Sequence, residues 1–437
     1  MIEHLRHWLH RRGHPVRYAL LEQLLRNQAL SREEIVRKQQ RDLADIVAFA
    51  AGNTPYYAEK LAPFLDGRPL ALEQLPILGK DDVAARLDDL LARDSQQHAD
   101  RSRVKIGHTG GSTGKPLAFW YDDAKHELMR AGMMRGFMMS GWRPGEKILN
   151  FWGARQDVAA GGVFGARFGD YIAAEKTIAA HEYSEARLQQ WARFIQSWRP
   201  VLLYGYASAL SELARFIVDS KMAMPRSLLG VYATAEVLDG WQRELMQQAF
   251  SCHVFNQYGC REVPNIAWEC RHGNMHVFAD LVYLESVEME GEDRLLVTSL
   301  TNRLMPFIRY DVGDSGRLLD GECACGSPFP MMEMGMCRQN DLIRTRGGKR
   351  FHPAYFNRLL YGMTQLRQYQ WVQHDLDRLS LNLVAATPLS DETVAALRAS
   401  LRRDVDAEMH LEVNYLAEIP RTASGKHRFV IGMAQPD

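Results

Sequence analysis

The chain has no long apolar run, no excess of either charge and few cysteines, and each absence excludes a class of protein. Among 437 residues, Lys plus Arg and Asp plus Glu number 53 each, so no overall field attracts nucleic acid or an anionic membrane. No run of about 18 apolar residues, the length of a membrane-spanning helix, occurs, and the start is charged from Glu3, unlike a signal peptide. We expect a cytoplasmic protein that binds no nucleic acid and does not insert into a membrane.

Six cysteines are too few for a disulfide framework in a chain of this length, and all fall between Cys252 and Cys337. Such clustering in a cytosolic chain indicates metal binding rather than redox chemistry. Two pairs of residues, one on each side of a strand expected around residues 294–300, have the ligand types of a tetrahedral zinc site. The pairs are Cys270 with His276 and Cys323 with Cys325. Further candidates are His272, His253, Cys252 and Cys260. The alternative is buried cysteine without a metal.

The composition, 46% hydrophobic and 24% charged, is that of a globular protein with two or three folding units. A capping box at Ser31 and Glu34 predicts a helix that ends near Asn53. Apolar residues at helical spacing predict a second helix over residues 188–198, followed by a strand over 201–204. The same alternation recurs with a helix over 241–250 before a strand at 253. This pattern favours an α/β body with ligand loops at the strand ends.

The character of the sequence changes at about Arg338. Residues 378–386 and 410–419 alternate apolar and polar side chains, and a helix is expected to begin near Ser390. We therefore place a large α/β domain at 1–337 and a small α+β domain at 338–437.

The segment from His108 to Pro116 reads HTGGSTGKP and follows a short apolar stretch. Glycines let backbone N–H groups turn toward an anion, hydroxyl groups donate further hydrogen bonds, and lysine supplies charge. The spacing differs from a Walker A loop. The predicted triphosphate-binding residues are Thr109, Gly110, Gly111, Ser112, Thr113, Gly114 and Lys115.

This loop resembles that of the adenylate-forming superfamily, which includes acyl-CoA ligases, and further motifs follow in the family's order. The run YGCRE is similar to a motif in which Tyr258 and Gly259 lie beside adenine and Glu262 holds magnesium. The run YATAE, ending in Glu236, resembles the segment that lies against adenine and the acyl pocket. In RYDVGD, the resemblance makes Asp314 the acceptor of the ribose hydroxyl groups.

The resemblance continues across the domain boundary into the small domain. The run CRQND is similar to the hinge motif, so Arg338 would contact ribose and Asp341 would be the pivot of a mobile small domain. The run PRTASGK resembles the family's C-terminal lysine motif, which makes Lys426 the catalytic cation. An ammonium group there would stabilise charge on the α-phosphate in the transition state.

The length and the segments around 196–210 and 304–314 are most similar to the phenylacetate-CoA ligase branch and its capsule-biosynthesis relatives. The resemblance implies an acid-thiol ligase that uses ATP, Mg²⁺ and coenzyme A on an aryl or apolar carboxylic acid. Aromatic residues expected in the acyl pocket are Trp152, Tyr204, Tyr206 and Tyr232. Open alternatives are transfer to an amine or a carrier protein, and a non-catalytic nucleotide-binding relative. A homodimer is compatible with the sequence.

Overall fold

The computed structural model describes most of the chain, in the following ranges. They are residues 2–64, 71–93, 104–108, 117–152, 175–180, 185–289, 292–338, 343–347, 350–351, 356, 359–360, 363, 365–420 and 428–433. The contacts divide the chain into a large unit, Met1–Val312 with Gly316–Glu333, and a small unit, Gly313–Ser315 with Met334–Asp437.

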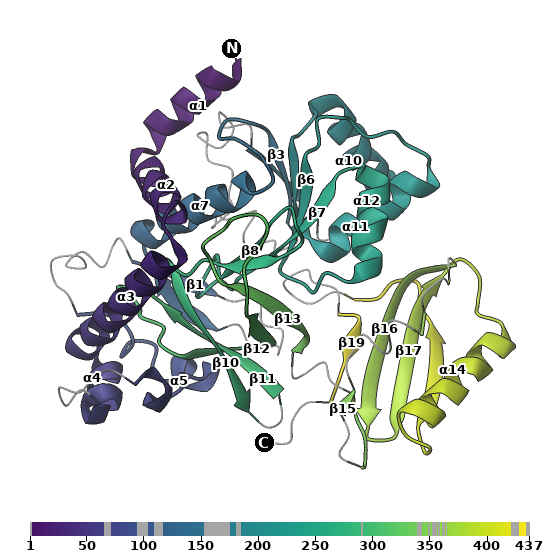
Figure 1. Ribbon diagram of the computed structural model, residues 1–437. Coiled ribbons are helices and arrows are strands. Elements are labelled where there is room, and N and C mark those ends of the chain that lie inside the picture. Colours follow the sequence, from purple (N-terminus) through teal and green to yellow (C-terminus); the bar gives the residue numbers. More distant parts are fainter. Residues whose placement is uncertain are drawn as a thin grey trace. The chain divides into compact units, whose positions relative to one another are not determined.

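A mixed sheet of eleven strands forms the centre of the large unit (Figure 1). Its order is β10-β11-β12-β13-β9-β8-β7-β6-β5-β3-β4, and β4, β3, β5, β6 and β7 run parallel to one another. The bounds of this parallel part are β3 Ile148–Trp152, β4 Glu175–Ala179, β5 Leu202–Tyr206, β6 Gly230–Thr234 and β7 His253–Tyr258. The remaining strands are β8 Ala267–Glu269, β9 Met275–Val277, β10 Val282–Met289, β11 Glu292–Ser299, β12 Tyr310–Leu319 and β13 Met331–Arg338.

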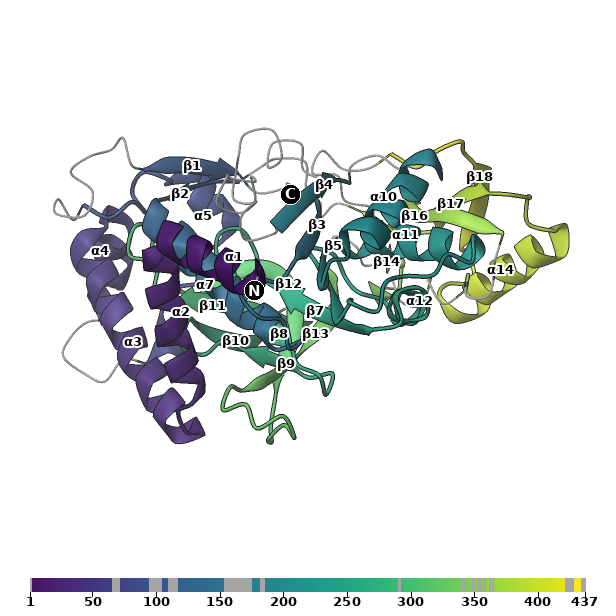
Figure 2. The same cartoon turned by 90° about the horizontal axis from the view of Figure 1, so that it is seen from above.

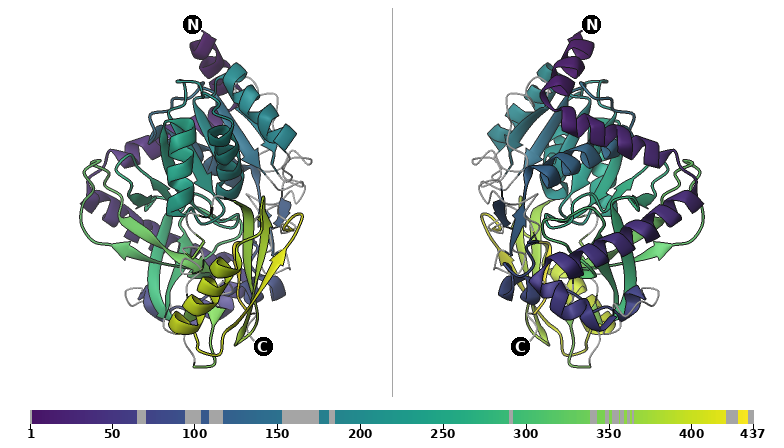
Figure 3. Two further views of the ribbon diagram at one scale, coloured as in Figure 1. Left: turned by 90° about the vertical axis from the view of Figure 1, so that its right-hand side faces the viewer. Right: turned by 90° about the vertical axis from the view of Figure 1, so that its left-hand side faces the viewer.

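Helices cover both faces of the parallel strands, as expected for an α/β body. One face packs against α10 (Glu185–Trp198), α11 (Ala207–Asp219) and α12 (Gly240–Phe250), which lie side by side (Figure 3, left). The opposite face packs against α7 (Asp123–Met138), and α2 lies along α7 (Figure 2). The N-terminal helices are α1 Ile2–Gly13, α2 Pro15–Gln28, α3 Arg32–Asn53, α4 Pro55–Leu61 and α5 Lys80–Ala85. A separate antiparallel pair consists of β1 Lys105–His108 and β2 Ala118–Tyr121.

Helix α7 approaches the sheet closely because it has glycines at the positions where it packs on the strands. A Cβ atom at Gly136 would lie 2.2 Å from the Trp268 ring, and one at Gly132 would lie 2.5 Å from the Asn265 amide. The Gly136 carbonyl accepts a 2.9 Å hydrogen bond from the Tyr232 hydroxyl. At this point no side chain larger than hydrogen fits between helix and sheet.

A buried ion pair fixes the same C-terminal part of α7. The Arg135 guanidinium donates to both oxygens of Asp280, at 2.7 and 2.9 Å, and both side chains are 0% exposed. The guanidinium also lies 3.9 Å from the ring centroid of Phe278. Asn27 of α2 donates to the same carboxylate at 2.9 Å. Removal of one partner would leave a buried charge uncompensated, so this pair fixes how α2 and α7 pack.

The small unit has a four-stranded sheet in the order β18-β17-β16-β19, with α14 beside it. Its core includes Trp371, Leu381 and Leu401, all 0% exposed. Bounds are β14 Ile343–Arg344, β15 Arg350–Phe351, β16 Leu366–Asp375, β17 Arg378–Ala385, α14 Asp391–Asp404, β18 His410–Tyr415 and β19 Val430–Ile431.

The structure confirms the α/β fold class and the elements expected from the sequence. The capping box of Ser31 and Glu34 is present, and α3 ends at Asn53 as predicted. Strand β5 follows α10, and the alternating runs near 378 and 410 are β17 and β18. Among the described residues, no helix combines the length and apolarity needed to cross a bilayer.

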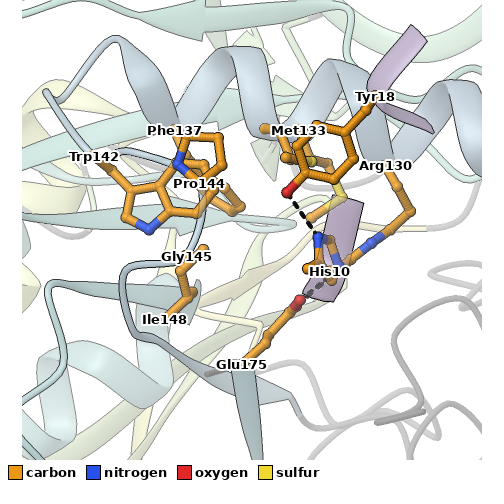
Figure 4. Close-up of a pocket in the computed structure, with 11 residues that line it drawn as sticks. His10, Tyr18, Arg130, Met133, Phe137, Trp142, Pro144, Gly145, Ile148 and Glu175 are labelled. Carbon is orange, nitrogen blue, oxygen red and sulfur yellow. Dashed lines mark hydrogen bonds and ion pairs between the residues drawn. The ribbon is translucent and has the colours of Figure 1, made fainter. Parts of the chain in front are cut away.

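His10 joins α1 to α2 in a polar contact that depends on pH (Figure 4). Its Nδ1 atom lies 2.9 Å from the Tyr18 hydroxyl, and its Nε2 atom lies 3.4 Å from Arg17. Burial, followed by the charge of Arg17, lowers the pKa of His10 from 6.5 to about 3. The His10 imidazole therefore stays neutral in the folded protein down to a pH of about 3, whereas in the unfolded chain it binds a proton below pH 6.5.

We predict that this imidazole makes the large unit less stable as pH falls from 6.5 toward 3. Its contribution between pH 8 and pH 5 is about 2 kcal/mol of unfolding free energy. In His10→Gln that contribution disappears, so the variant loses less stability over this range than the wild type. Urea unfolding at both pH values measures the difference. Equal acid sensitivity of the two proteins would contradict the assignment.

Candidate active site at the carboxyl edge of the sheet

The parallel strands end together at one edge of the sheet, where ligands bind in open α/β folds. Polar or aromatic residues end each of four neighbouring strands. They are Trp152 of β3, Tyr206 of β5, Thr234 of β6 and Tyr258 of β7. Two of the sequence motifs, YATAE and YGCRE, lie at this edge, at the ends of β6 and β7.

A tight turn after β7 places the Glu262 carboxylate in the interior. The turn closes by a 3.1 Å hydrogen bond from the Cys260 N–H to the Val263 carbonyl. A Cβ atom at Gly259 would lie 2.9 Å from the backbone nitrogen of Asn265, so glycine is required for the close approach. Glu262 is 5% exposed. Its motif is therefore a buried site rather than a surface loop.

The Tyr310 hydroxyl donates to Oε1 of Glu262 at 2.7 Å. Burial, and then the Glu262 carboxylate, raise the pKa of Tyr310, so the phenol keeps its proton and remains a donor. One hydrogen bond leaves acceptor capacity on the carboxylate, which is the ligand type that magnesium prefers.

Arg261 connects this turn to the beginning of the glycine-rich loop. Its guanidinium donates to the His108 carbonyl at 2.6 Å, and His108 ends β1. The sequence leaves the role of an arginine at this position open, and the structure gives it this contact. The predicted phosphate residues Thr109 to Lys115 lie outside the described residues.

Lys125 is a residue of this site that sequence reasoning missed. Its ammonium group donates to the Glu262 carbonyl at 2.8 Å and lies 4.7 Å from the Phe119 ring centroid. Burial lowers its pKa from 10.5 to about 8, against the opposing charges of Glu262 and Cys260. A signal was present: Lys125 lies in the first turn of α7, where the helix dipole disfavours a cation unless it has a partner.

Glu236, which the resemblance places beside adenine, contacts the first turn of α11 in the structure. Its carboxylate accepts hydrogen bonds from the backbone N–H of Ser208 at 2.7 Å and the Ser208 hydroxyl at 3.0 Å. Ser208 lies in the first turn of α11, where backbone N–H groups have no acceptor within the helix. The Glu236 carboxylate supplies an acceptor there, and its negative charge interacts favourably with the helix dipole. In this structure Glu236 positions the loop after β6.

The aromatic residues expected in the acyl pocket form one cluster on the face of the sheet covered by α7. The Trp152 ring is stacked on Tyr204 with centroids 5.9 Å apart and lies 4.8 Å from Tyr206. Tyr204 and Thr234 both donate to Oε1 of Gln257. Tyr232 lies deeper, 0% exposed, and contacts α7. The sequence missed Gln257, which joins three strands of this edge.

Asp314 lies in β12, four residues after Tyr310, and is partly buried. Arg338 ends β13, but its side chain is outside the described part of the chain, as are Asp341 and Lys426. The segment that carries Lys426 is attached to β16 at both ends. Ile419 donates from its backbone N–H to the Gln368 side chain at 3.2 Å, and Gln370 donates to the Arg428 carbonyl at 3.0 Å.

The four residues predicted as zinc ligands lie together in the large unit. The ligand atoms of Cys270, His276, Cys323 and Cys325 all lie within 4.8 Å of one another. The first three side chains are buried and Cys325 is exposed. The sequence alternatives His272, His253, Cys252 and Cys260 are not part of this cluster.

The spacing of the four atoms fits a tetrahedral ion. Two thiolates at 2.3 Å from zinc would be about 3.8 Å apart. The sulfur atoms of Cys270 and Cys323 are 3.7 Å apart, and Cys325 Sγ lies 3.3 Å from Nε2 of His276. Nδ1 of His276 lies 3.2 Å from the Phe329 carbonyl. Donation to that carbonyl fixes the tautomer that leaves Nε2 as a ligand.

Comparison with known proteins agrees with the resemblance found in the motifs. Residues 342–433 match the family model of the CapK C-terminal domain. The chain is 22% identical to Protein CapK of Staphylococcus aureus over 91% of this chain and 89% of that protein. It is 24% identical to a phenylacetate-coenzyme A ligase of Thermus thermophilus, over 93% and 98% of the two chains.

The fold is that of an adenylate-forming ligase. The crystal structure of a 2-hydroxyisobutyryl-CoA ligase in the postadenylation state, in complex with R3-HIB-AMP, superposes with a TM-score of 0.73. The match covers 93% of this chain and 91% of that one at 18% identity. The resemblance stated from the sequence, to acyl-CoA ligases and capsule-biosynthesis relatives, is confirmed.

We predict that Lys125 makes the protein more stable as pH rises between about 8 and 10.5. In this range the unfolded chain still holds a proton that the folded protein has released, so stability increases with pH. The gain from pH 7 to 9.5 is about 2 kcal/mol of unfolding free energy.

The variant Lys125→Met keeps the length of the side chain and loses this gain. Urea unfolding at both pH values measures it. Lys105→Met is the matched control, because Lys105 is an exposed lysine paired with Asp123 near the start of the same helix. If the two variants respond to pH alike, Lys125 is not a buried cation.

Proposed function

We propose that this protein activates a carboxylic acid with ATP to an acyl-adenylate and transfers the acyl group to a thiol, that of coenzyme A. The observation that carries the proposal is the buried Glu262 carboxylate in the turn after β7, joined through Arg261 to the start of the glycine-rich loop. Similarity over nine-tenths of the chain to a phenylacetate-coenzyme A ligase supports it.

In the first step, a carboxylate oxygen of the acid attacks the α-phosphate of ATP. A new oxygen–phosphorus bond forms, and the bond to pyrophosphate breaks. Residues Thr109 to Lys115 would hold the departing phosphates through backbone N–H groups and the Lys115 ammonium. Lys426 would stabilise the negative charge that grows on the phosphoryl oxygens in the transition state.

Glu262 would hold a magnesium ion, which would supply neutralisation of the negative charge on the nucleotide phosphates. The chemistry of the donor fits: a buried carboxylate with one tyrosine hydrogen bond and further lone pairs. Tyr310 orients this carboxylate. Tyr258 and Gly259 would lie against adenine, Glu236 would position the loop near it, and Asp314 and Arg338 would contact ribose.

In the second step, the thiolate attacks the acyl carbon and AMP leaves with the electron pair of the broken carbon–oxygen bond. We propose that the small domain, residues 338–437, turns about Asp341 between the steps and withdraws Lys426. The acid would lie in the aromatic cluster of Trp152, Tyr204 and Tyr206, which suits an aryl or apolar acid.

A different acceptor is the second candidate. An amine or a carrier protein would then receive the acyl group from the same adenylate. A cytoplasmic protein, in monomeric or homodimeric form, is compatible with either acceptor. A non-catalytic nucleotide-binding relative is the outcome if no acid is activated.

Exchange of labelled pyrophosphate into ATP, measured with a panel of acids, tests the first step. We expect acid-dependent exchange by the wild type and a loss of about 100-fold or more in Lys426→Ala, because one positioned charge contributes that much to a transition state. Transfer from a supplied acyl-adenylate to coenzyme A should be largely retained. Equal loss in both half-reactions would contradict the role of Lys426, and no exchange with any acid would overturn the proposed function.

We also propose that Cys270, His276, Cys323 and Cys325 hold a structural zinc ion. Protein purified without chelator should contain about one zinc per chain by elemental analysis, and Cys323→Ser should contain far less and melt at a lower temperature. Cys252→Ser is the control, because that cysteine is outside the cluster. Full-length folded protein without zinc would remove the proposal.

A further inference from the structure

Helix α1 packs on the protein through its histidines and turns apolar side chains outward. The His7 and His10 rings contact Tyr18, with centroid distances of 5.4 and 5.5 Å, and His10 is buried. The outward side chains form the α1 stripe, which consists of Leu5, Trp8 and Leu9, 54%, 53% and 37% exposed. Positions i, i+3 and i+4 lie on one side of a helix, and a surface helix ordinarily packs such a stripe on its own core. In α1 this arrangement is reversed.

Packing on the opposite side of α1 fixes the outward direction of the stripe. A Cβ atom at Gly145 would lie 2.9 Å from the Glu3 carbonyl oxygen and 3.1 Å from Cβ of His7, so α1 contacts the loop before β3 directly. The hydrogen bond between His10 and Tyr18 joins it to α2 as well. The helix projects from the large unit (Figures 1 and 3). These contacts therefore hold the α1 stripe in solvent.

Arginine side chains lie within the α1 stripe and along its borders. The Arg12 guanidinium lies over the Trp8 ring, 5.4 Å from its centroid. Helical spacing places Arg6 on one border of the stripe and Arg11 on the other. Arg11 forms a 2.5 Å ion pair with Glu22 of α2. Cations and apolar side chains thus share one side of the helix.

Further cations from the sheet region lie near Arg6. Burial, and then the charges of Arg6 and Lys176, lower the pKa of Lys147. The charge of Arg199 adds to this shift, and that of Glu3 opposes it. Glu3 is the acidic residue of α1, and it lies on the side of the helix that packs on the loop before β3. The surroundings of the stripe are therefore locally positive, although the whole chain has no net charge.

The size of the α1 stripe distinguishes between kinds of partner. A helix of 12 residues is about 18 Å long and about 10 Å wide, so its outward side covers roughly 200 Å². A stable interface with a second copy or another folded protein buries about 800 Å² on each partner. A lipid surface needs less area, because apolar side chains enter the headgroup boundary while tryptophan and arginine remain at its polar level. The area and the charge together favour an anionic bilayer.

We propose that α1 docks the protein on the surface of an anionic phospholipid bilayer. Leu5, Trp8 and Leu9 enter the boundary between headgroups and acyl chains, and Arg6 and Arg12 contact lipid phosphates. The contact is peripheral and reversible, since three apolar side chains and a few charges supply it. It does not depend on the proposed acid activation, because α1 is remote in sequence from every motif of the candidate site.

Cosedimentation of the full-length protein with vesicles tests the docking. One vesicle contains phosphatidylcholine alone, and the other is an equal mixture of phosphatidylcholine and phosphatidylglycerol. We expect partition to the mixed vesicle to be at least about tenfold stronger, because each arginine near an anionic surface contributes about fivefold. Added salt should weaken this binding by screening the charges.

The double variant Leu5→Gln with Trp8→Gln removes most of the α1 stripe and should bind the mixed vesicle about tenfold more weakly or less. The matched control is Val36→Gln with Leu318→Gln, which replaces two exposed apolar residues of α3 and β12. The control should bind as the wild type does.

The variant Arg12→Gln tests the charge and should bind about fivefold more weakly. Arg37→Gln is its control, because Arg37 is an exposed arginine on α3 and its loss should leave binding unchanged. Thermal melting verifies that each variant is folded. If the double variant does not fold, the lipid preference of the wild type and the Arg12→Gln result decide.

The inference is overturned if the wild type binds neither vesicle, binds both equally, or keeps its binding in the double variant. It is also overturned if light scattering shows a wild-type dimer that the double variant converts to a monomer, since the stripe is then an interface between copies. Pyrophosphate exchange by the double variant should equal that of the wild type. Loss of lipid binding and failure of the proposed function are therefore separate results.

Discussion

The close packing of α7 on the sheet is the constraint on which the site depends. Two glycines bring the helix against Trp268 and Asn265, and the buried pair of Arg135 and Asp280 fixes the same part of the helix. The same helix carries Lys125 to the Glu262 turn. Because a helix is rigid over this length, a small shift at the glycines would displace every contact that α7 makes with the strands.

Buried charged side chains of the large unit form pairs between different elements. Arg130 of α7 pairs with Glu175 of β4, and Arg309, the residue before β12, pairs with Glu285 of β10. A buried pair contributes little net stability compared with apolar packing, but a broken pair is costly. Such pairs therefore select one arrangement of helix and sheet, which is what a site with directed polar groups requires.

The Glu262 carboxylate of the candidate site is held on one side by the protein. Tyr310 donates to one of its oxygens, and lone pairs remain for a cation. Because the protein fixes the orientation of the carboxylate, less conformational freedom is lost when a ligand binds.

Sequence reasoning found what local pattern encodes. Periodicity and capping located α3, α10 and α14, and the spacing of cysteines and histidine found the four residues that cluster. It missed Lys125 and Gln257, since each acts through contacts between segments far apart in the chain. Lys125 and Glu262, for example, are 137 residues apart.

The sequence by itself determined the order of the elements, the fold class and the chemistry of the motifs, because each depends on residues close together in the chain. Only the tertiary structure decided which side chains are buried and which atoms have partners. Glu236 and Asn150 show the difference: a carboxylate found by its motif is held at a helix N-terminus, and an asparagine outside any motif has a buried oxygen with no donor among the described residues. Burial and hydrogen-bond satisfaction depend on strands and helices brought together by packing.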